Sequence, residues 1–475
     1  MLDEFDVQGI WHLPDEDINE KGLVGNLYSD KGDFFLDIVG SLSNLEEDIF
    51  KYNYIHGFTT KGEEITLINS YIRNENFNAP GLKHQRLIVN SFIVGGYLTD
   101  IDQAKFQSVK VSSTYLTKWF HSKPFTQRSS KNENETTEYS TSFIPPDINT
   151  FYLPYLDANI KNHYYFKSKG NFIDNMTYLY NEAIKITPSD WKNYDWFDDK
   201  LFGLNKLLTL LINEPIYFEH IIFLGEYEET DKSDDSKKRK EYHLYFSQGE
   251  IEIKERMHPH KMLFTFEDVR SNFENIFNNW FKKMSELKNV YNLHLGNFFN
   301  KNTVETKFLN AIQALEVYHR TQGHGKLFSD EDKNAYLHTV NESIKDVLPD
   351  KIKKEINKSL KHLNEYSLNK RLKDIIRNLN DDTITFLFGS RKKGKHFAYR
   401  LVNSRNFLTH YDEEGNEYRY KDIELHYASN ILEILSTLKL FTELGIEEDY
   451  VLKAIKNNRY LPSIISNSKS ELHLA

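Results

Sequence analysis

The sequence contains no cysteine in 475 residues. This absence excludes disulfide bonds and thiolate chemistry, and it fits a reducing compartment. Long apolar runs are also missing, since none approaches the roughly 20 residues that a membrane-spanning helix needs. The acidic start, MLDEFDVQGIW, lacks the apolar segment of a secretory signal. We therefore expect a cytoplasmic protein with no membrane partner.

Most common cofactor motifs are missing as well. The sequence has no GxxxxGK[ST] phosphate-binding loop and no GxSxG elbow, and Gly95-Gly96 lacks the rest of a dinucleotide fingerprint. His258-Pro259-His260, with Glu255 nearby, is the one metal-like cluster. Because no third and fourth ligand is evident, a polar turn at the end of a strand explains it better. We expect neither a cofactor nor a metal.

Acidic residues are missing from one long segment. Between Thr383 and Tyr411 there is no Asp or Glu, although the formal net charge of the chain is −10. A phosphate group would be attracted to this segment and repelled by most of the remaining chain. The segment is therefore predicted to bind a phosphate backbone through its cations, which are Arg391, Lys392, Lys393, Lys395, Arg400 and Arg405.

The first half of the chain has the pattern of a β-rich domain. Alternating or apolar runs are typical of strands, and two pairs of them flank turn sequences, at Ser29–Gly32 and at Thr60–Glu63. Residues 122–147 are polar with Pro145-Pro146 near the end, and we expect a solvated, mobile loop there. Helical leucine spacing at 199–211 and two long strands, 216–227 and 241–253, follow.

The second half of the chain has the period of amphipathic helices. We expect one long helix over 268–291, and Asn302-Thr303-Val304-Glu305 resembles the capping box of the next. Further helices are predicted at 341–356 with a break at Pro349, and at 368–379, 397–409, 422–444 and 447–456. The predicted fold class is α+β, with a β-rich domain over 1–265 and an all-α helical bundle over 266–475.

Arg405, Asn406 and His410 lie in the apolar-flanked segment RLVNSRNFLTHY. The Arg-x4-His spacing is weak evidence, because Arg391/His396 has it too, although we expect that pair to straddle Gly394 in a loop. Five residues turn a helix by about 140°, so Arg405 and His410 do not share a face. A long arginine side chain, or a second copy of the helix in a dimer, would bring the two groups together.

RNFLTH resembles the Arg-Asn-x3-His signature of HEPN ribonucleases. The earlier segment FLNAIQALEVYHR is similar to the matching helix of the ApeA-like HEPN subfamily, through Phe308, Glu316, Tyr318, His319 and Arg320. Asn279-Trp280-Phe281 also resembles that group, and GIWHLPDEDINEKGLVGNLYSDKGDFFLDIVGSL resembles the start of the ApeA N-terminal domain. The likeness touches both ends of the chain and leaves about 122–260 unmatched.

The resemblance implies RNA cleavage by a homodimer formed through the HEPN domain. It further implies prokaryotic anti-phage defence by abortive infection, with transfer RNA as the expected target. The N-terminal domain would then sense a phage-derived trigger or restrain the nuclease. Arg391, Lys392, Lys393, Lys395 and Arg400 are the predicted RNA-binding residues.

The chemistry of RNA agrees with this implication. RNA carries its own nucleophile, the 2′-OH, so an enzyme needs only proton transfer and charge stabilisation. His410 has an imidazole suited to proton transfer near neutral pH, and Arg405 matches phosphate oxygens bidentately. Asn406 would bond the phosphate or fix the His410 tautomer. Glu316 would orient Arg405 across the bundle, or would merely face solvent.

Two function classes remain open at this point. One is a metal-independent endoribonuclease that leaves 2′,3′-cyclic phosphate and 5′-OH ends, with Arg405, His410, Asn406 and Glu316 at the site. The other is a catalytically inactive HEPN-like module that binds RNA or protein. A carbohydrate-binding protein built on the aromatic-rich sheet is disfavoured because the sequence shows no secretory signal.

Overall fold

The computed structural model describes most of the 475-residue chain. The described residues are 4–42, 50–77, 81–131, 137–171, 174–227, 238–249, 251–254, 256–323, 325–360, 364–411 and 416–474. The chain divides into two compact units, Met1–Phe281 and Lys282–Ala475. The first is rich in strands and the second is helical, so the predicted α+β class with a helical C-terminal half is confirmed.

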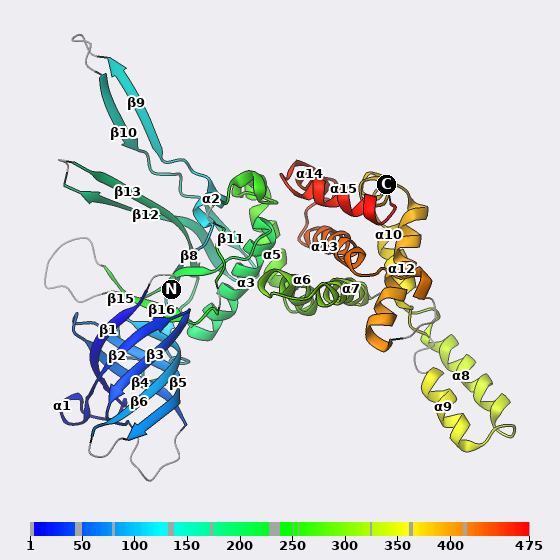
Figure 1. The fold of residues 1–475 in the computed structure, drawn as a ribbon, viewed down its shortest axis with the longest axis horizontal. Coiled ribbons are helices and arrows are strands. Elements are labelled where there is room, and N and C mark those ends of the chain that lie inside the picture. Colours follow the sequence, from blue (N-terminus) through cyan, green and yellow to red (C-terminus); the bar gives the residue numbers. More distant parts are fainter. Residues whose placement is uncertain are drawn as a thin grey trace. The chain divides into compact units, whose positions relative to one another are not determined.

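The first six long strands close into a barrel (Figure 1). The hydrogen-bonded order is β6-β3-β2-β1-β4-β5, and β5 also pairs with β6 along its length, which completes the ring. Both predicted hairpins are present, and positive φ values at Lys31, Gly32 and Gly62 supply their turns. The strands are β1 (Asp6–His12), β2 (Leu23–Asp30), β3 (Asp33–Val39), β4 (Lys51–Thr59), β5 (Glu64–Phe77) and β6 (Lys83–Val94).

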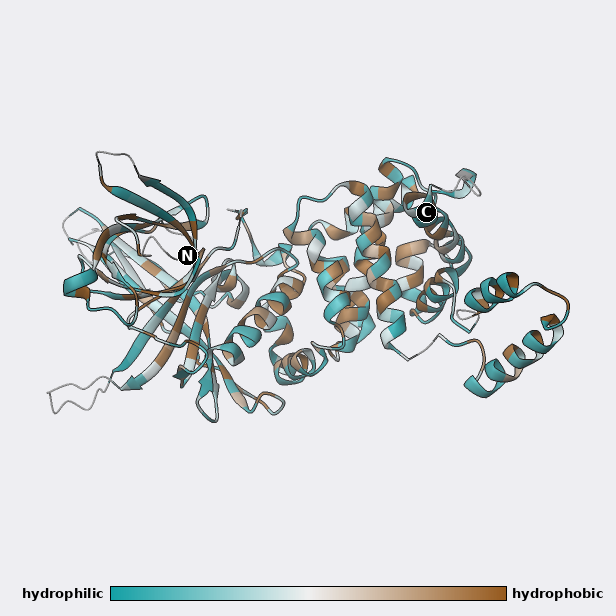
Figure 2. Cartoon of the chain, turned by 90° about the horizontal axis from the view of Figure 1, so that it is seen from below, coloured by the Kyte–Doolittle hydropathy of each residue, from teal (hydrophilic) through white to brown (hydrophobic). Residues whose placement is uncertain are grey.

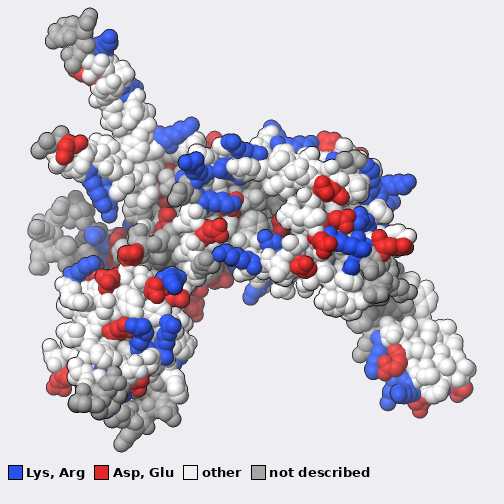
Figure 3. Space-filling view, viewed as in Figure 1, with Lys and Arg blue, Asp and Glu red and all other residues white. Residues whose placement is uncertain are grey.

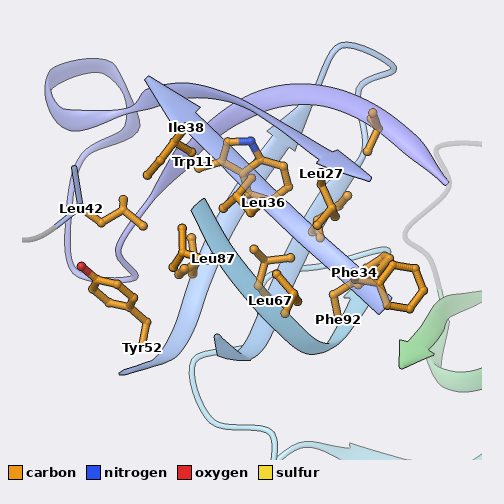
Figure 4. Close-up of a cluster of buried hydrophobic side chains, with 14 of the residues drawn as sticks. Trp11, Leu27, Phe34, Leu36, Ile38, Leu42, Tyr52, Leu67, Leu87 and Phe92 are labelled. Atoms are coloured by element: carbon orange, nitrogen blue, oxygen red, sulfur yellow. The ribbon is translucent and has the colours of Figure 1, made fainter. Parts of the chain in front are cut away.

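An apolar core fills the barrel (Figure 4). Trp11 is completely buried at its centre, among Leu27, Leu36 and Leu67. Its ring lies directly over Gly57, where any Cβ would overlap the indole. A side chain as large as tryptophan fits this narrow interior because the facing position on the paired strand β4 has none.

The sheet continues beyond the barrel through β6, whose second half pairs with β16 (Arg239–Phe246). The order then runs β16-β15-β8-β13-β12-β11, and the 19-residue helix α3 (Tyr194–Ile212) belongs to the same unit. β15 (Phe218–Tyr227) confirms the first of the two predicted long strands, whereas β16 ends well before Ile253. The remaining strands are β8 (Ser108–Ser113), β11 (Thr150–Leu153), β12 (Ala158–Gly170) and β13 (Met176–Pro188), with a small pair β7 (Lys105–Phe106) and β14 (Lys192–Asn193).

The predicted loop at 122–147 contains a two-stranded hairpin instead. β9 (Phe125–Lys131) and β10 (Thr137–Phe143) pair antiparallel from Phe125↔Phe143 to Lys131↔Thr137. Composition misled the prediction because nearly every side chain on these strands is exposed, so the apolar alternation of a half-buried strand is absent. Phe143 stacks on Phe166 of β12 at a centroid distance of 4.2 Å, which attaches the hairpin base to the sheet.

The helix predicted over 268–291 is several elements. A short α4 (Phe266–Val269) and a 3₁₀ turn lead into α5 (Phe273–Lys283), which anchors on α3 because the Trp280 indole donates to the Gly203 carbonyl at 2.9 Å. After a turn the chain forms α6 (Lys288–Phe299). The two compact units divide within this region, later than the predicted boundary at residue 265.

The second unit is a helical bundle built around α13 (Ile423–Glu443), which is buried along most of its length. Figure 2 shows apolar colouring gathered on these bundle helices. Thr303 caps α7 as predicted, Pro349 separates α8 from α9, and Gly445 ends α13 with a positive φ. The other helices are α7 (Val304–Thr321), α8 (Asp330–Ile344), α9 (Asp350–Leu360), α10 (Leu368–Arg377), α11 (Asp381–Phe388), α12 (Arg391–His410), α14 (Glu448–Asn457) and α15 (Leu461–Glu471).

Among the helices that the structure describes, none has both the length and the apolar character needed to span a bilayer.

Candidate functional site on helix α12

Helix α12 carries all the predicted basic and catalytic residues except Glu316. It begins earlier than expected, at Arg391, because the Ser390 hydroxyl accepts from the Lys393 amide and caps it. The prediction of a loop around Gly394 is therefore wrong. Gly394 lies inside the helix, where a Cβ would come within 3.0 Å of Ile376 on α10. The glycine permits close helix packing rather than a turn.

The last two turns of α12 present Arg405, Asn406 and His410. Arg405 Nη1 donates to the Asn406 carboxamide oxygen at 3.4 Å, and both side chains are half-buried. His410 is the final helical residue and is exposed. The helix stops there because Tyr411 adopts a left-handed conformation and donates its amide to the Phe407 carbonyl at 2.7 Å. The three groups thus lie at one solvent-accessible helix end.

The apolar anchoring of this segment is narrower than expected. Leu401 is completely buried, whereas Val402, Phe407 and Leu408 are only half-buried. The adjoining Tyr411 is 76% exposed. At the end of α12, the polar residues Arg405, Asn406 and His410 therefore lie beside an apolar surface that is partly exposed to solvent.

The segment from Tyr420 to Glu424, which leads into α13, holds the middle of α12 in place. The buried Ser404 hydroxyl accepts from the Tyr420 amide at 2.8 Å and donates to the Arg400 carbonyl at 2.8 Å. The Arg400 guanidinium lies 3.9 Å from the Tyr420 ring centre and pairs with Glu424 at 3.0 Å. These contacts fix α12 against the start of α13 and engage Arg400 within the protein.

The predicted phosphate-binding cations do not gather at one point. Arg391 pairs with Asp381 at 2.7 Å and donates to the carbonyls of Arg377 and Leu379, so it closes the end of α10. Lys392 and Lys395 are exposed on the first turns of α12. At 1.5 Å per residue, Lys395 lies about 22 Å along the axis from His410. The basic end and the Arg405–His410 end are opposite ends of one helix.

Glu316, on α7, contacts a different arginine from the one predicted. Its carboxylate pairs with Arg320 at 3.0 Å, one helical turn further on. Arg320 also pairs with Glu365 at 2.9 Å, and these two hydrogen bonds raise the pKa of Arg320. Glu316 therefore supports a contact between α7 and the segment that precedes α10.

Two further residues of the α7 motif lie in a buried network that sequence patterns did not reveal. His319 Nδ1 bonds the guanidinium of the buried Arg371 at 3.2 Å, and its Nε2 lies 3.7 Å from Asp374. Tyr318 donates to Glu443 on α13 at 2.9 Å, and burial together with that carboxylate raises the pKa of Tyr318. These partners lie 52 to 125 residues away in sequence, so local spacing could not identify them.

The described residues contain no group of three or more His, Asp or Glu side chains arranged for a metal. His258 and His260 stack with ring centres 5.4 Å apart beside a short 3₁₀ turn. Glu255 lies outside the described residues.

Two family models match the chain. The ApeA N-terminal domain 1 model matches residues 6–280, and the Apea-like HEPN model matches residues 309–450. The first alone covers more than half of the 475 residues. The chain belongs to the ApeA family. Its HEPN match includes Glu316 and the whole of α12, and HEPN domains are generally ribonucleases that bind RNA and dimerise. No significant match is found among the curated proteins or the solved structures.

A buried histidine is expected to make the helical unit sensitive to acid. His294 of α6 is 2% exposed, its Nδ1 has no hydrogen-bond partner, and burial lowers its pKa to about 4. Below pH 6.5 the His294 imidazole binds a proton in the unfolded chain but stays neutral in the folded protein. The free energy of unfolding therefore falls as the pH drops from 6.5 toward 4. We expect this histidine alone to cost about 2 kcal/mol between pH 7 and pH 5.

Urea unfolding at the two pH values, followed by helical circular dichroism, measures this loss. His294→Leu should remove that part of the acid sensitivity, while His426→Leu at an exposed site on α13 should not. Equal acid sensitivity in all three proteins would contradict the assignment.

Proposed function

We propose that the chain is a metal-independent endoribonuclease of anti-phage abortive infection, with transfer RNA as the expected target. The observation that carries the proposal is the Arg405–Asn406 hydrogen bond in the last two turns of α12, which end at the exposed His410, within the HEPN match. Family membership supports a nuclease role in antiviral defence.

The reaction needs two proton transfers and no external nucleophile. Removal of the 2′-OH proton lets the 2′-oxygen attack the adjacent phosphorus, forming the 2′,3′-cyclic phosphate. The bond from phosphorus to the 5′-oxygen breaks, and that oxygen takes a proton to become a 5′-OH. The exposed His410 supplies one proton-transfer group, and Arg405 balances the charge that develops on the phosphoryl oxygens. Asn406 holds the guanidinium or a phosphate oxygen.

A homodimer supplies what one chain lacks. Each chain brings one histidine to this helix end, whereas the reaction uses an acid and a base. The half-buried Phe407 and Leu408 and the exposed Tyr411 give the site an apolar border that a second copy would cover. Two α12 ends facing each other would present two imidazoles to one phosphodiester.

The RNA is proposed to extend along α12 beyond the cleaved bond. Lys392, Lys393 and Lys395 lie on the first turns, about 22–27 Å from His410 along the axis. An RNA backbone would have to present several successive phosphates to contact both ends of the helix. This length suits a structured RNA better than a single bound nucleotide. Arg391 and Arg400 contribute indirectly, because their ion pairs shape the helix.

The ApeA N-terminal domain is proposed to sense a phage-derived trigger and to restrain the nuclease until then. Its hairpins β9–β10 and β12–β13 support this role, because their outer strand segments are exposed rather than used in a core.

Glu316 is proposed to act as a positioning residue through Arg320. Glu316→Gln removes one of two carboxylate partners of Arg320, while Glu365 remains. We expect kcat to fall by less than about tenfold with an unchanged pH–rate profile, since no reacting group is lost. Single-turnover cleavage assays across pH 5–9 measure both. A loss as large as that of His410→Ala would place Glu316 in contact with the RNA.

The deciding experiment incubates purified protein with total RNA in the presence of EDTA and maps the product ends. Discrete fragments with 2′,3′-cyclic phosphate and 5′-OH ends are expected. Cleavage that EDTA abolishes, or products with 5′-phosphate ends, would refute the mechanism. RNA binding without cleavage would favour the inactive binding module.

A further inference from the structure

Helices α8 and α9 form an arm on which the described part of the bundle leaves every side chain exposed or half-buried. The arm comprises residues 330–360 and leaves the bundle as a helical hairpin (Figure 1). Neither helix contains a single buried residue. Most helical stability in proteins comes from packing an apolar face, so two helices that bury nothing lack their usual source of stability.

The base of the arm is nevertheless firmly built. Residues 325–328 and 364–366 run antiparallel, and Leu327 and Tyr366 donate their amides to the carbonyls of Asn364 and Gly325 at 2.9 and 2.8 Å. The buried Asn364 side chain bonds both the amide and the carbonyl of Phe328. Arg371 of α10 donates to the Tyr366 carbonyl at 3.0 Å. These hydrogen bonds join the two described segments at the base of the arm to each other and to α10.

Each helix of the arm carries an apolar stripe at helical spacing. The stripe residues recur every three or four positions, and all are half-buried or exposed: Leu337, Val340 and Ile344 on α8, and Ile352, Ile356 and Leu360 on α9. Ile352 is 46% exposed, and it lines an open groove on α9 with Ile356 and Leu360. Figure 3 shows a broad face of the arm that is free of charged side chains. An exposed apolar stripe such as the one on α9 is typical of a protein–protein contact.

The charges on the two helices are opposite. α8 has four acidic residues against one lysine, a net charge of −3. α9 has four lysines against two acidic residues, a net charge of +2. The ion pairs Lys353–Asp350 and Lys358–Glu355 lie within α9. On α8, Asp330 and Glu342 pair with Lys326 and Lys345, which flank the helix, while Glu331 and Asp332 keep its first turn acidic. An arm with one acidic and one basic helix is complementary to a second copy of itself.

We propose that the arm pairs with the arm of a second copy of this chain. A two-fold axis places α8 of one copy on α9 of the other, and the symmetry repeats the same contact. The four helices then enclose the apolar stripes as a small bundle, with acidic and basic edges facing each other. This pairing does not depend on the ribonuclease activity and names a dimer contact separate from the end of α12.

The absence of cysteine makes the test clean, because any introduced thiol is the sole one in the chain. Ile356→Cys lies on the apolar stripe of α9, and Lys354→Cys lies on the opposite face of the same helix. Both are made in the full chain with His410→Ala to avoid toxicity, and are treated with a short bis-maleimide. We expect interchain crosslinking at position 356 to exceed that at 354 by about tenfold or more, since only the stripe faces the partner.

Charge reversal then identifies the partner helix. In the Ile356→Cys background, one variant adds Glu331→Lys and Glu342→Lys on α8, and another adds Lys351→Glu and Lys358→Glu on α9. Each variant alone should crosslink about fivefold less, and an equal mixture should recover the yield, because both contacts of the mixed pair are again attractive. Equal crosslinking at positions 354 and 356, or a yield unaltered by charge reversal, would overturn the pairing.

Discussion

His410→Ala is expected to reduce RNA cleavage by about 10²–10⁴-fold, the usual contribution of a positioned acid–base group. His410 is exposed at the last residue of α12, so its removal leaves no cavity and no unpaired buried partner. RNA binding and chain association should therefore change little. Single-turnover cleavage of a labelled transfer RNA, with binding measured in parallel, separates the chemical step from recognition.

The same helix provides a matched control. His396 is exposed on α12 near Lys395, so His396→Ala tests the loss of an exposed imidazole from a more basic position. It should keep wild-type cleavage. Arg405→Lys should lose most activity despite keeping the charge, because lysine lacks the planar fork that binds two phosphoryl oxygens. Full cleavage by His410→Ala, with normal product ends, would show that the acid–base groups lie elsewhere in the chain.

The second large effect concerns stability of the barrel. Trp11→Ala should destabilise it by about 3–5 kcal/mol, because a completely buried indole leaves a cavity that six paired strands cannot close. Trp11→Phe should cost much less, since it keeps a ring and removes an indole N–H that has no hydrogen-bond partner among the described residues. Hydrogen-exchange mass spectrometry of barrel peptides in the full chain measures both, apart from the helical bundle.

Gly57 supplies a thermodynamic cycle for the same contact. In the wild type, Gly57→Ala places a methyl group into the Trp11 ring and should cost about 1–3 kcal/mol. In the Trp11→Ala background that overlap is gone, so Gly57→Ala should become neutral or slightly stabilising. Additive costs in the double variant would mean that the two positions do not share one steric constraint.

Local patterns in the sequence predicted the elements whose signals are short-range. The hairpin turns at Lys31-Gly32 and Gly62 demand positive φ, and their glycines were visible in the sequence. The Thr303 cap and the Gly445 stop are equally local. Closure of the barrel could not be predicted, because it depends on β6 pairing with β3 and β5 at once.

Local sequence patterns predict only part of the candidate site as well. The helical position of Arg405, Asn406 and His410 follows from a local pattern, and α12 contains all three residues. The ion-pair partners of the other cations cannot be predicted from a local sequence pattern. Arg400 meets Glu424 and Arg391 meets Asp381 only because three helices pack together. A count of charges along the sequence treats these paired arginines as available, which the tertiary contacts contradict.

The pairing of strand β6 determines how the barrel and the outer sheet would share a mechanical load. One of its edges is bonded first to β3 and then to β16, while its other edge is bonded to β5. The hydrogen-bonded ladder consequently runs without a seam from the barrel wall to β11. A pull along the outer strands would load this ladder in shear, because the barrel and the outer sheet share the hydrogen bonds of β6.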